Sequence, residues 1–440
     1  MTQMSLLTVL SRIDQARPQG CTLTGWRSFQ LGVLFLPTSA LLSGLSLVFA
    51  ITVARPKPSH KPLGRPISRA LALLSALLVL GVGTAIKPDL AAIGLANWLP
   101  LFWLFLAVGP YLSTAASRHR VALWIVIGTM PVIGMGLIQA WLGWSEPLEA
   151  LGGLLAWPMG DPQRATGIFD TVNNTASWLL ISFPFLLQRL RTPEQKPLAR
   201  AMTMAVIGLA SACVMLTASR MAVLMLPVAA LLTTQRRRLP LLLIPISIYA
   251  LLAGLKVNGL IDHWPGISVL VPDLLTAKFA RLFDFMSGHS PAEVRTSLYP
   301  IGWQLISTSP WLGIGENGFR ALLLKGSIVL PTTESLNHTH SLPLEFALSH
   351  GLPALALLLA AMGWVSAKAV QHWRLHSDPQ GQDRAWLLAA GLVIWVHIWD
   401  IPAYDSRFNM AGWLIFAALL AIGSRSLQPP QTEQPQRSPA

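Results

Sequence analysis

Two histidines, His338 and His340, stand where a long polar segment meets an apolar run. Histidine is the side chain whose unperturbed pKa, about 6.5, suits proton abstraction near neutral pH, so His340 is a candidate general base. The structural alternative for His340 is a packed or helix-capping histidine. A metal site is disfavoured because the two histidines are close neighbours and no third ligand has a recognisable spacing. We therefore expect neither a metal nor another cofactor.

Arginines are the second kind of candidate. Arg220 follows Ser219 directly, between two apolar runs, and Arg164 and Arg295 lie in more polar segments. A guanidinium group is always charged and binds phosphate oxygens in a bidentate manner, so several arginines on one face predict a phosphate or diphosphate ligand. The alternative for Arg220 is an interfacial arginine that reaches lipid headgroups. Further arginines of this group are Arg281, Arg320 and Arg407.

Two polar turns have structural interpretations. The segment from Gly313 to Phe319 resembles a phosphate-binding loop only superficially, because it lacks the following Lys-Ser/Thr and a βαβ context. We predict a tight turn there. The segment from Asp400 to Arg407 carries acids and a base close together, and we predict an ion-paired turn that satisfies its own charges.

Long apolar runs must position these residues. The chain has 440 residues, of which 53% are hydrophobic and only 12% charged, about half the charged fraction of soluble domains. A helix needs about 20 apolar residues to cross a bilayer. We predict an all-α polytopic membrane protein with about eleven (10–12) transmembrane helices. The expected spans are 29–54, 68–86, 94–114, 120–142, 173–190, 200–218, 220–235, 239–256, 342–370, 385–402 and 408–424.

The domain organisation follows from these spans. We expect an N-terminal leader over 1–28, an integral membrane domain over 29–424 and a Pro/Gln-rich disordered tail over 425–440. The segment 257–341 is the only sizeable loop outside the membrane, and long loops in compact proteins are usually functional. The first span is interrupted at Leu36-Pro37-Thr38-Ser39, so it is either one crossing helix or a re-entrant hairpin.

The distribution of Lys and Arg predicts the orientation. Loops on one side of the expected spans carry 19 of these residues, and loops on the other side carry 10. The richer side is cytoplasmic by the positive-inside rule, which places His340 and the candidate arginines on the face opposite the cytoplasm. The leader, with Arg12, Arg17 and Arg27, fits this orientation only if the first span is a hairpin.

The net charge of +13 would indicate nucleic-acid binding in a soluble protein. Here the basic residues lie in short loops between apolar runs, a pattern typical of topology control, so we expect no nucleic-acid partner. The two cysteines, Cys21 and Cys213, indicate neither a disulfide framework nor a metal site.

Several motifs are similar to those of the O-antigen ligase and O-antigen polymerase superfamily of bacterial envelope-glycan enzymes. One is the superfamily's ligase signature: His, then Asn, Ser or Gln, nine residues, Gly, two residues, and Gly, Thr or Tyr. Here His340-Ser341 is followed by nine residues and Gly351, and only Ala354 departs from the pattern. The other resembling runs are Arg164–Phe169 with Asn173–Ala176, the Ser219-Arg220 junction, and Arg295 with Trp303 and Pro310–Gly315.

The resemblance implies a lipid-donor glycosyltransferase that works without a metal or a nucleotide. Its ligases move a glycan from undecaprenyl diphosphate to lipid A-core outside the cytoplasmic membrane. Carried onto this chain, His340 accepts the proton of the acceptor hydroxyl, and Arg220 and Arg295 bind the lipid diphosphate. Arg164 and His338 are second candidates for binding donor or acceptor. The expected partners are the lipid-linked glycan donor, a lipid A-core or other glycan acceptor, and membrane lipid.

Other functions remain open at this point. An O-antigen polymerase or an O-linked protein glycosylase would use the same chemistry with another acceptor, which the sequence does not reveal. The turn 400–407 and the segment Leu36–Ser39 look similar to cyanobacterial superfamily members, one of which was proposed to take part in bicarbonate accumulation, so a transporter is a third alternative. A transporter should carry ionisable residues within its spans, whereas here the candidates lie on the outer face, which favours an enzyme.

Overall fold

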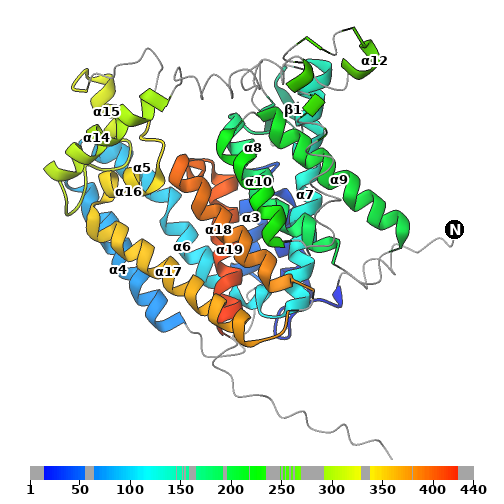
Figure 1. Ribbon diagram of the computed structural model, residues 1–440. Coiled ribbons are helices and arrows are strands. Elements are labelled where there is room, and N and C mark those ends of the chain that lie inside the picture. The colour runs from blue at the N-terminus through cyan, green and yellow to red at the C-terminus, as the bar shows by residue number, and fades with distance from the viewer. Residues whose placement is uncertain are drawn as a thin grey trace, which may run out of the picture.

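The chain folds into a bundle of helices, seen in Figure 1, in a computed structural model that is mostly helical. The structure describes residues 14–54, 64–144, 146–150, 152, 155–157, 165–191, 196–217, 219–233, 248, 251–252, 254–256, 259–260, 263–268, 292–328, 337–378 and 380–424. The disordered tail predicted over 425–440 and most of the span predicted over 239–256 lie outside the described residues.

Most of the described helices lie within the predicted apolar runs. The helices from α2 to α10 are α2 (Leu23–Phe35), α3 (Ala40–Thr52), α4 (Gly64–Val82), α5 (Pro88–Gly94), η1 (Leu95–Asn97), α6 (Leu99–Ala107), η2 (Gly109–Leu112), α7 (Ala115–Leu142), α8 (Val172–Arg189), α9 (Pro197–Thr217) and α10 (Arg220–Thr233). The later helices are α12 (Pro265–Ser268), α14 (Ala292–Thr308), α15 (Gly318–Leu324), α16 (Leu342–His350), α17 (Leu352–Leu375), α18 (Gln382–Trp399), η4 (Pro402–Tyr404) and α19 (Ser406–Ser424). Between α7 and α8, the antiparallel strands β1 (Leu148–Ala150) and β2 (Leu155–Trp157) pair.

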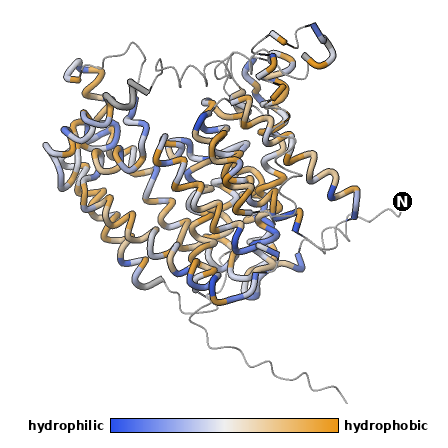
Figure 2. The backbone as a smooth tube through the Cα atoms, viewed as in Figure 1, coloured by the Kyte–Doolittle hydropathy of each residue, from blue (hydrophilic) through white to orange (hydrophobic). Residues whose placement is uncertain are grey.

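Five of the described helical stretches are long and apolar enough to cross a membrane: Pro88–Ala107, Ala115–Leu142, Pro197–Thr217, Leu352–Leu375 and Ser406–Ser424. Shorter apolar helices accompany them at Ala40–Thr52, Pro66–Val82 and Arg220–Thr233. Figure 2 shows apolar residues along the bundle, with hydrophilic residues gathered toward the helix ends. The helical class and the multi-pass membrane character are therefore confirmed, while the number of eleven spans stays a prediction.

The first predicted span is a hairpin of two helices. The Ser28 hydroxyl donates to the Ser46 carbonyl, and the Ser43 hydroxyl donates to the Gly32 carbonyl, each at 2.8 Å, which pairs α2 and α3 antiparallel. The chain turns at Pro37, and Ser39 then caps α3. A helix of 13 residues rises only about 20 Å, less than the roughly 30 Å of a bilayer core. The structure thus favours the hairpin alternative over one crossing helix.

Two helices, α8 and α19, are buried along most of their length inside the bundle. Helix α19 packs against α17, α18 and α6, and 78% of its apolar window is buried inside the protein. Trp413 of α19 meets the ring edges of Phe102 and Phe105 at centroid distances of 5.1 and 5.6 Å. Helix α8 is buried along most of its length between α7, α9, α10 and α18. These two helices therefore form much of the buried interior of the bundle.

The apolar run predicted as one span over 342–370 is two helices, because Gly351 interrupts it. Gly351 has φ +85°, and a Cβ atom there would overlap the Trp311 carbonyl. The nine residues of the ligase signature between Ser341 and Gly351 are thus one short helix, α16, and α17 begins after the glycine. Ala354, which departs from the signature, is fully buried in α17, in agreement with a small helix-packing residue.

Candidate functional site

His340 lies in a tight turn directly before α16. Its backbone has φ +53°, a left-handed conformation that non-glycine residues adopt rarely. The His340 amide donates to Nδ1 of His338 at 3.2 Å, and the centroids of the two imidazole rings are 4.2 Å apart. Both side chains are partly exposed. The turn thus presents two imidazoles side by side at the protein surface.

Asp400, at the end of α18, is the partner of His340. Its Oδ1 lies 3.1 Å from Nδ1 of His340. Its Oδ2 accepts a hydrogen bond from the side-chain amide of Asn173 at 2.5 Å. Burial by itself would raise the pKa of Asp400, but the hydrogen bond from His340 and the charges of His340 and His338 lower it to about 2. Asp400 is therefore ionised at neutral pH.

These contacts determine which ring nitrogen carries a proton. An ionised carboxylate can only accept, so Nδ1 of His340 carries the proton and Nε2 keeps a lone pair that can take up a proton. In His338, Nδ1 accepts from a backbone amide, so Nε2 carries the proton and can donate to an oxygen of a ligand. The adjacent imidazoles thus offer one base and one donor.

A chain of hydrogen bonds extends from Asp400 through Asn173 to Ser219. Asn173, in the first turn of α8, donates to Asp400 and accepts from the Ser219 hydroxyl at 3.2 Å. Ser219 immediately precedes Arg220, the first residue of α10, whose side chain is exposed. The Ser219-Arg220 junction and the His340 turn, far apart in sequence, therefore belong to one site.

The other predicted arginines are placed less completely. Arg164 and Arg281 lie outside the described residues, and Arg295 lies in α14, where the backbone is described but its side chain is not. Arg320 is exposed on α15. The assignments of Arg164 and Arg295 to substrate binding therefore stay predictions.

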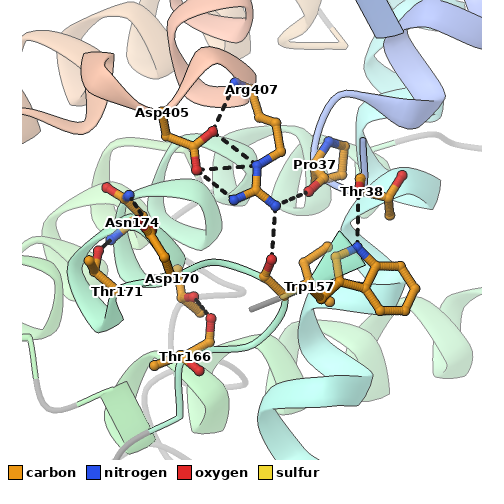
Figure 3. Close-up of polar contacts among 11 residues, drawn as sticks. Pro37, Thr38, Trp157, Thr166, Asp170, Thr171, Asn174, Asp405 and Arg407 are labelled. Atoms are coloured by element: carbon orange, nitrogen blue, oxygen red, sulfur yellow. Dashed lines mark hydrogen bonds and ion pairs between the residues drawn. The ribbon is translucent and has the colours of Figure 1, made fainter. Parts of the chain in front are cut away.

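Arg407 has a structural position, shown in Figure 3. Its guanidinium group pairs with Asp405, the closest atoms being 2.6 Å apart, and it also donates to the carbonyls of Ile168 at 2.8 Å and Pro37 at 3.3 Å. It stacks over the Phe169 ring, 4.2 Å from the centroid. The prediction of an ion-paired turn is right for Asp405 and Arg407, whereas Asp400 faces His340 instead.

The glycine-rich segment 313–318 packs under the signature helix. The Ile314 and Gly315 amides donate to the Leu348 and Ser349 carbonyls at 2.9 and 3.0 Å. A Cβ atom at Gly313, which has φ +72°, would overlap the backbone of Ser349. Glycine is therefore needed here for close backbone packing, in agreement with the tight turn predicted in place of a phosphate loop.

A metal ion is an alternative ligand for the histidine turn. His338, His340 and Asp400 offer ligand atoms within 4.8 Å of one another, so the structure supplies the third ligand that sequence spacing did not reveal. Three protein ligands are the number that catalytic zinc sites use. However, Nδ1 of each imidazole already takes part in a hydrogen bond with a protein atom. This arrangement favours a hydrogen-bonded acid–base pair, and a metal-free site stays a prediction.

Sequence reasoning missed two residues that hydrogen-bond to the predicted site, Asp400 and Asn173. The sequence pattern groups Asp400 with the turn that follows it. Asp400 also lies at the end of an apolar run and two residues before a proline, where a helix-terminal carboxylate can face another element. Asn173 was noted only as part of a family resemblance. Hydrogen bonding across elements is the property that identifies both.

The fold and the site describe a multi-pass membrane protein with a histidine–aspartate pair beside an arginine at a helix start. Residues 205–359 match a family model described as O-antigen ligase, and this match supports membership of the chain in the O-antigen ligase superfamily. The matched segment includes Ser219-Arg220, the His340 turn and Gly351. Membership implies a glycosyltransferase-like enzyme with lipid-linked glycan and acceptor partners in general. No curated protein matches the chain.

Proposed function

We propose that the protein transfers a glycan from undecaprenyl diphosphate to lipid A-core on the periplasmic face of the inner membrane, with inversion and without a metal. The observation that carries the proposal is the His340–Asp400 pair, 3.1 Å apart, next to the Ser219-Arg220 junction and inside a region that matches the O-antigen ligase family. The ligase signature around His340 favours a ligase over a polymerase or an O-linked protein glycosylase.

His340 is the base in this mechanism. Nε2 takes the proton of the acceptor hydroxyl as its oxygen attacks the anomeric carbon, and the bond from that carbon to the diphosphate oxygen breaks. Asp400 accepts from Nδ1–H throughout, keeps the ring in the reactive tautomer and stabilises the imidazolium that forms. A positioned base of this kind contributes about 100- to 10,000-fold to the rate. One direct displacement inverts the anomeric configuration.

Arginines assist the departure of the lipid diphosphate. Arg220 is exposed beside the hydrogen-bonded chain that leads to His340, so its guanidinium can neutralise the charge that develops on the leaving oxygen. Arg295, in α14 of the predicted large loop, is the second proposed ligand, and Arg164 and His338 are further contacts for donor or acceptor. Removing one preorganised donor of this kind typically costs about 100- to 1,000-fold in rate.

A deletion strain tests the function in the cell. Lipopolysaccharide is compared on gels after complementation with the wild type, with His340→Ala, or with His263→Ala, a matched change at an exposed histidine. We expect loss of long-chain lipopolysaccharide and accumulation of lipid-linked glycan in the deletion strain, with rescue by the wild type and His263→Ala only. Unchanged long-chain lipopolysaccharide after deletion would refute lipid A-core as the acceptor.

A further inference from the structure

A buried carboxylate, that of Glu345, lies directly beneath the His338–His340 turn. Glu345 belongs to the first turn of α16 and is 3% exposed. Its Oε2 accepts a hydrogen bond from the Thr339 amide at 2.8 Å, and its Oε1 accepts one from the Tyr404 hydroxyl at 3.5 Å. The mechanism above does not use this group.

We propose that Glu345 is a positioning residue for the transfer reaction: by binding the Thr339 amide, it holds the turn in the conformation that places His340 against Asp400. The proposal rests on the proposed function, in which His340 is the base.

Backbone strain explains why the turn needs such a contact. His340 has φ +53°, which disfavours the observed turn unless surrounding contacts support it. Thr339, the middle residue of the turn, is fully buried, so its amide loses a partner if Glu345 is removed. A relaxed turn would change the direction of the His340 ring. A displacement of about 1 Å at a reacting group can cost on the order of 100-fold in rate.

Tyr404 provides a second hydrogen bond to the Glu345 carboxylate. Tyr404, in η4, donates to it and packs near the His338 ring, with centroids 5.8 Å apart. Burial and the adjacent carboxylates of Glu345 and Glu316 raise the pKa of Tyr404 well above its usual value, so it stays a donor. Glu316 in turn lies 2.9 Å from Nε2 of His350, the last residue of α16. Contacts on two sides therefore fix the Glu345 carboxylate.

The titration of Glu345 provides a specific readout. Burial, together with the charge of Glu316, raises its pKa to about 7, although the hydrogen bonds from Thr339 and Tyr404 lower it. Above that pH the ionised carboxylate accepts from the Thr339 amide more strongly than the protonated form does. In the wild type, acidification therefore protonates the carboxylate that supports the turn, whereas a glutamine at 345 stays neutral over the whole pH range.

The experiment uses the purified full-length protein, with kcat and KM measured for the lipid-linked donor between pH 5.5 and 8.5. Glu345→Leu removes the acceptor of the Thr339 amide, Glu345→Gln keeps an acceptor but cannot ionise, and Ser349→Ala is the control. Ser349 is buried on the same helix, and its hydroxyl has no hydrogen-bond partner among the described residues. Histidine-selective ¹⁵N NMR reports the tautomer of His340 independently of activity.

We expect Glu345→Leu to lower kcat by about 10- to 100-fold, with KM for the donor nearly unchanged and the His340 Nδ1–H signal lost. Glu345→Gln should recover most of kcat at pH 7 and show a less steep acid limb than the wild type. Ser349→Ala should behave as the wild type. A wild-type kcat in Glu345→Leu overturns the proposal, as does an acid limb of unchanged steepness in Glu345→Gln, which decides the matter if the leucine variant fails to fold. Full activity of His340→Ala would instead overturn the proposed function itself.

Discussion

Replacing Arg407 by alanine should destabilise the protein strongly, because Arg407 connects three segments of the chain. Its side chain is 11% exposed and pairs with Asp405, which is 10% exposed. The same guanidinium group donates to the carbonyls of Pro37, at the tip of the α2–α3 hairpin, and Ile168, just before α8. The change leaves one carboxylate and two carbonyls without this partner and removes the cation–π contact to Phe169.

The magnitude follows from these contacts. Removing one partner of a buried ion pair costs about 3–5 kcal/mol, because the remaining charge stays buried without compensation. The carbonyls and the aromatic contact would add to this, but water that enters the space of the lost side chain satisfies part of them. We therefore expect the free energy of unfolding to fall by about 3–5 kcal/mol in total.

The assay is reversible unfolding of the purified protein in detergent, followed by tryptophan fluorescence. Arg407→Lys keeps the charge but not the planar fork and should lie between the wild type and the alanine variant. Arg320→Ala, at an exposed arginine, should change the free energy by less than about 0.5 kcal/mol. Because the penalty arises from the orphaned Asp405, adding Asp405→Asn to Arg407→Ala should recover part of the loss. A free energy of Arg407→Ala within about 1 kcal/mol of the wild type would refute the reasoning.

Three further predictions concern the site and its support. Asp400→Asn should lower kcat by about 100- to 10,000-fold by favouring the wrong tautomer of His340, whereas Asp89→Asn, at an exposed aspartate of α5, should leave the steady-state rate unchanged. Gly351→Ala should destabilise the protein, because Gly351 has φ +85° and a new Cβ would overlap the Trp311 carbonyl. Thermal unfolding measures the loss, with Gly363→Ala as the control because a Cβ there meets open space. Transfer activity should survive exhaustive treatment with a chelator. If the chelator abolishes activity and added Zn²⁺ restores it, His338, His340 and Asp400 hold a metal.

A pH-dependent prediction follows from Glu345. Its pKa in the folded protein is raised to about 7 from the ordinary 4.5, so its contribution to stability is fully present below pH 4.5 and is lost as the pH rises through 7. The Glu345→Gln variant cannot ionise at this position, so its stability does not fall in this way as the pH rises. The variant should therefore gain stability relative to the wild type between about pH 5 and pH 8, as measured by thermal unfolding in matched buffers. A constant difference across this range would contradict the raised pKa.

The sequence predicted the helical membrane fold because apolar runs of spanning length are a local signal. It also located the His340 turn and the Ser219-Arg220 junction, which carry short motifs. What it could not predict was the break of the run 342–370 at Gly351, since that break depends on Trp311 packing against the glycine from another element. A glycine inside an apolar run does not by itself predict a helix break; the segment that packs against it must be known as well.

The partner of His340 was beyond sequence reasoning for the same reason. Asp400 lies 60 positions further along the chain, and its hydrogen bond to His340 forms because α16 and α18 pack together. The sequence predicts an ion-paired turn over 400–407, which is right for Asp405 and Arg407, whereas Asp400 pairs with His340 outside the turn. Local charge patterns identify pairs within a turn, whereas pairs between helix ends require the tertiary structure.

The most direct test of the central claim is glycan transfer by the purified protein, from an undecaprenyl diphosphate carrier to lipid A-core in detergent or liposomes. Wild type, His340→Ala and the exposed-histidine control His263→Ala are compared at equal protein levels after a check of folding. We predict transfer by the wild type and His263→Ala and a rate at least about 100-fold lower for His340→Ala. Transfer by His340→Ala at the wild-type rate would contradict the assignment of His340 as the base.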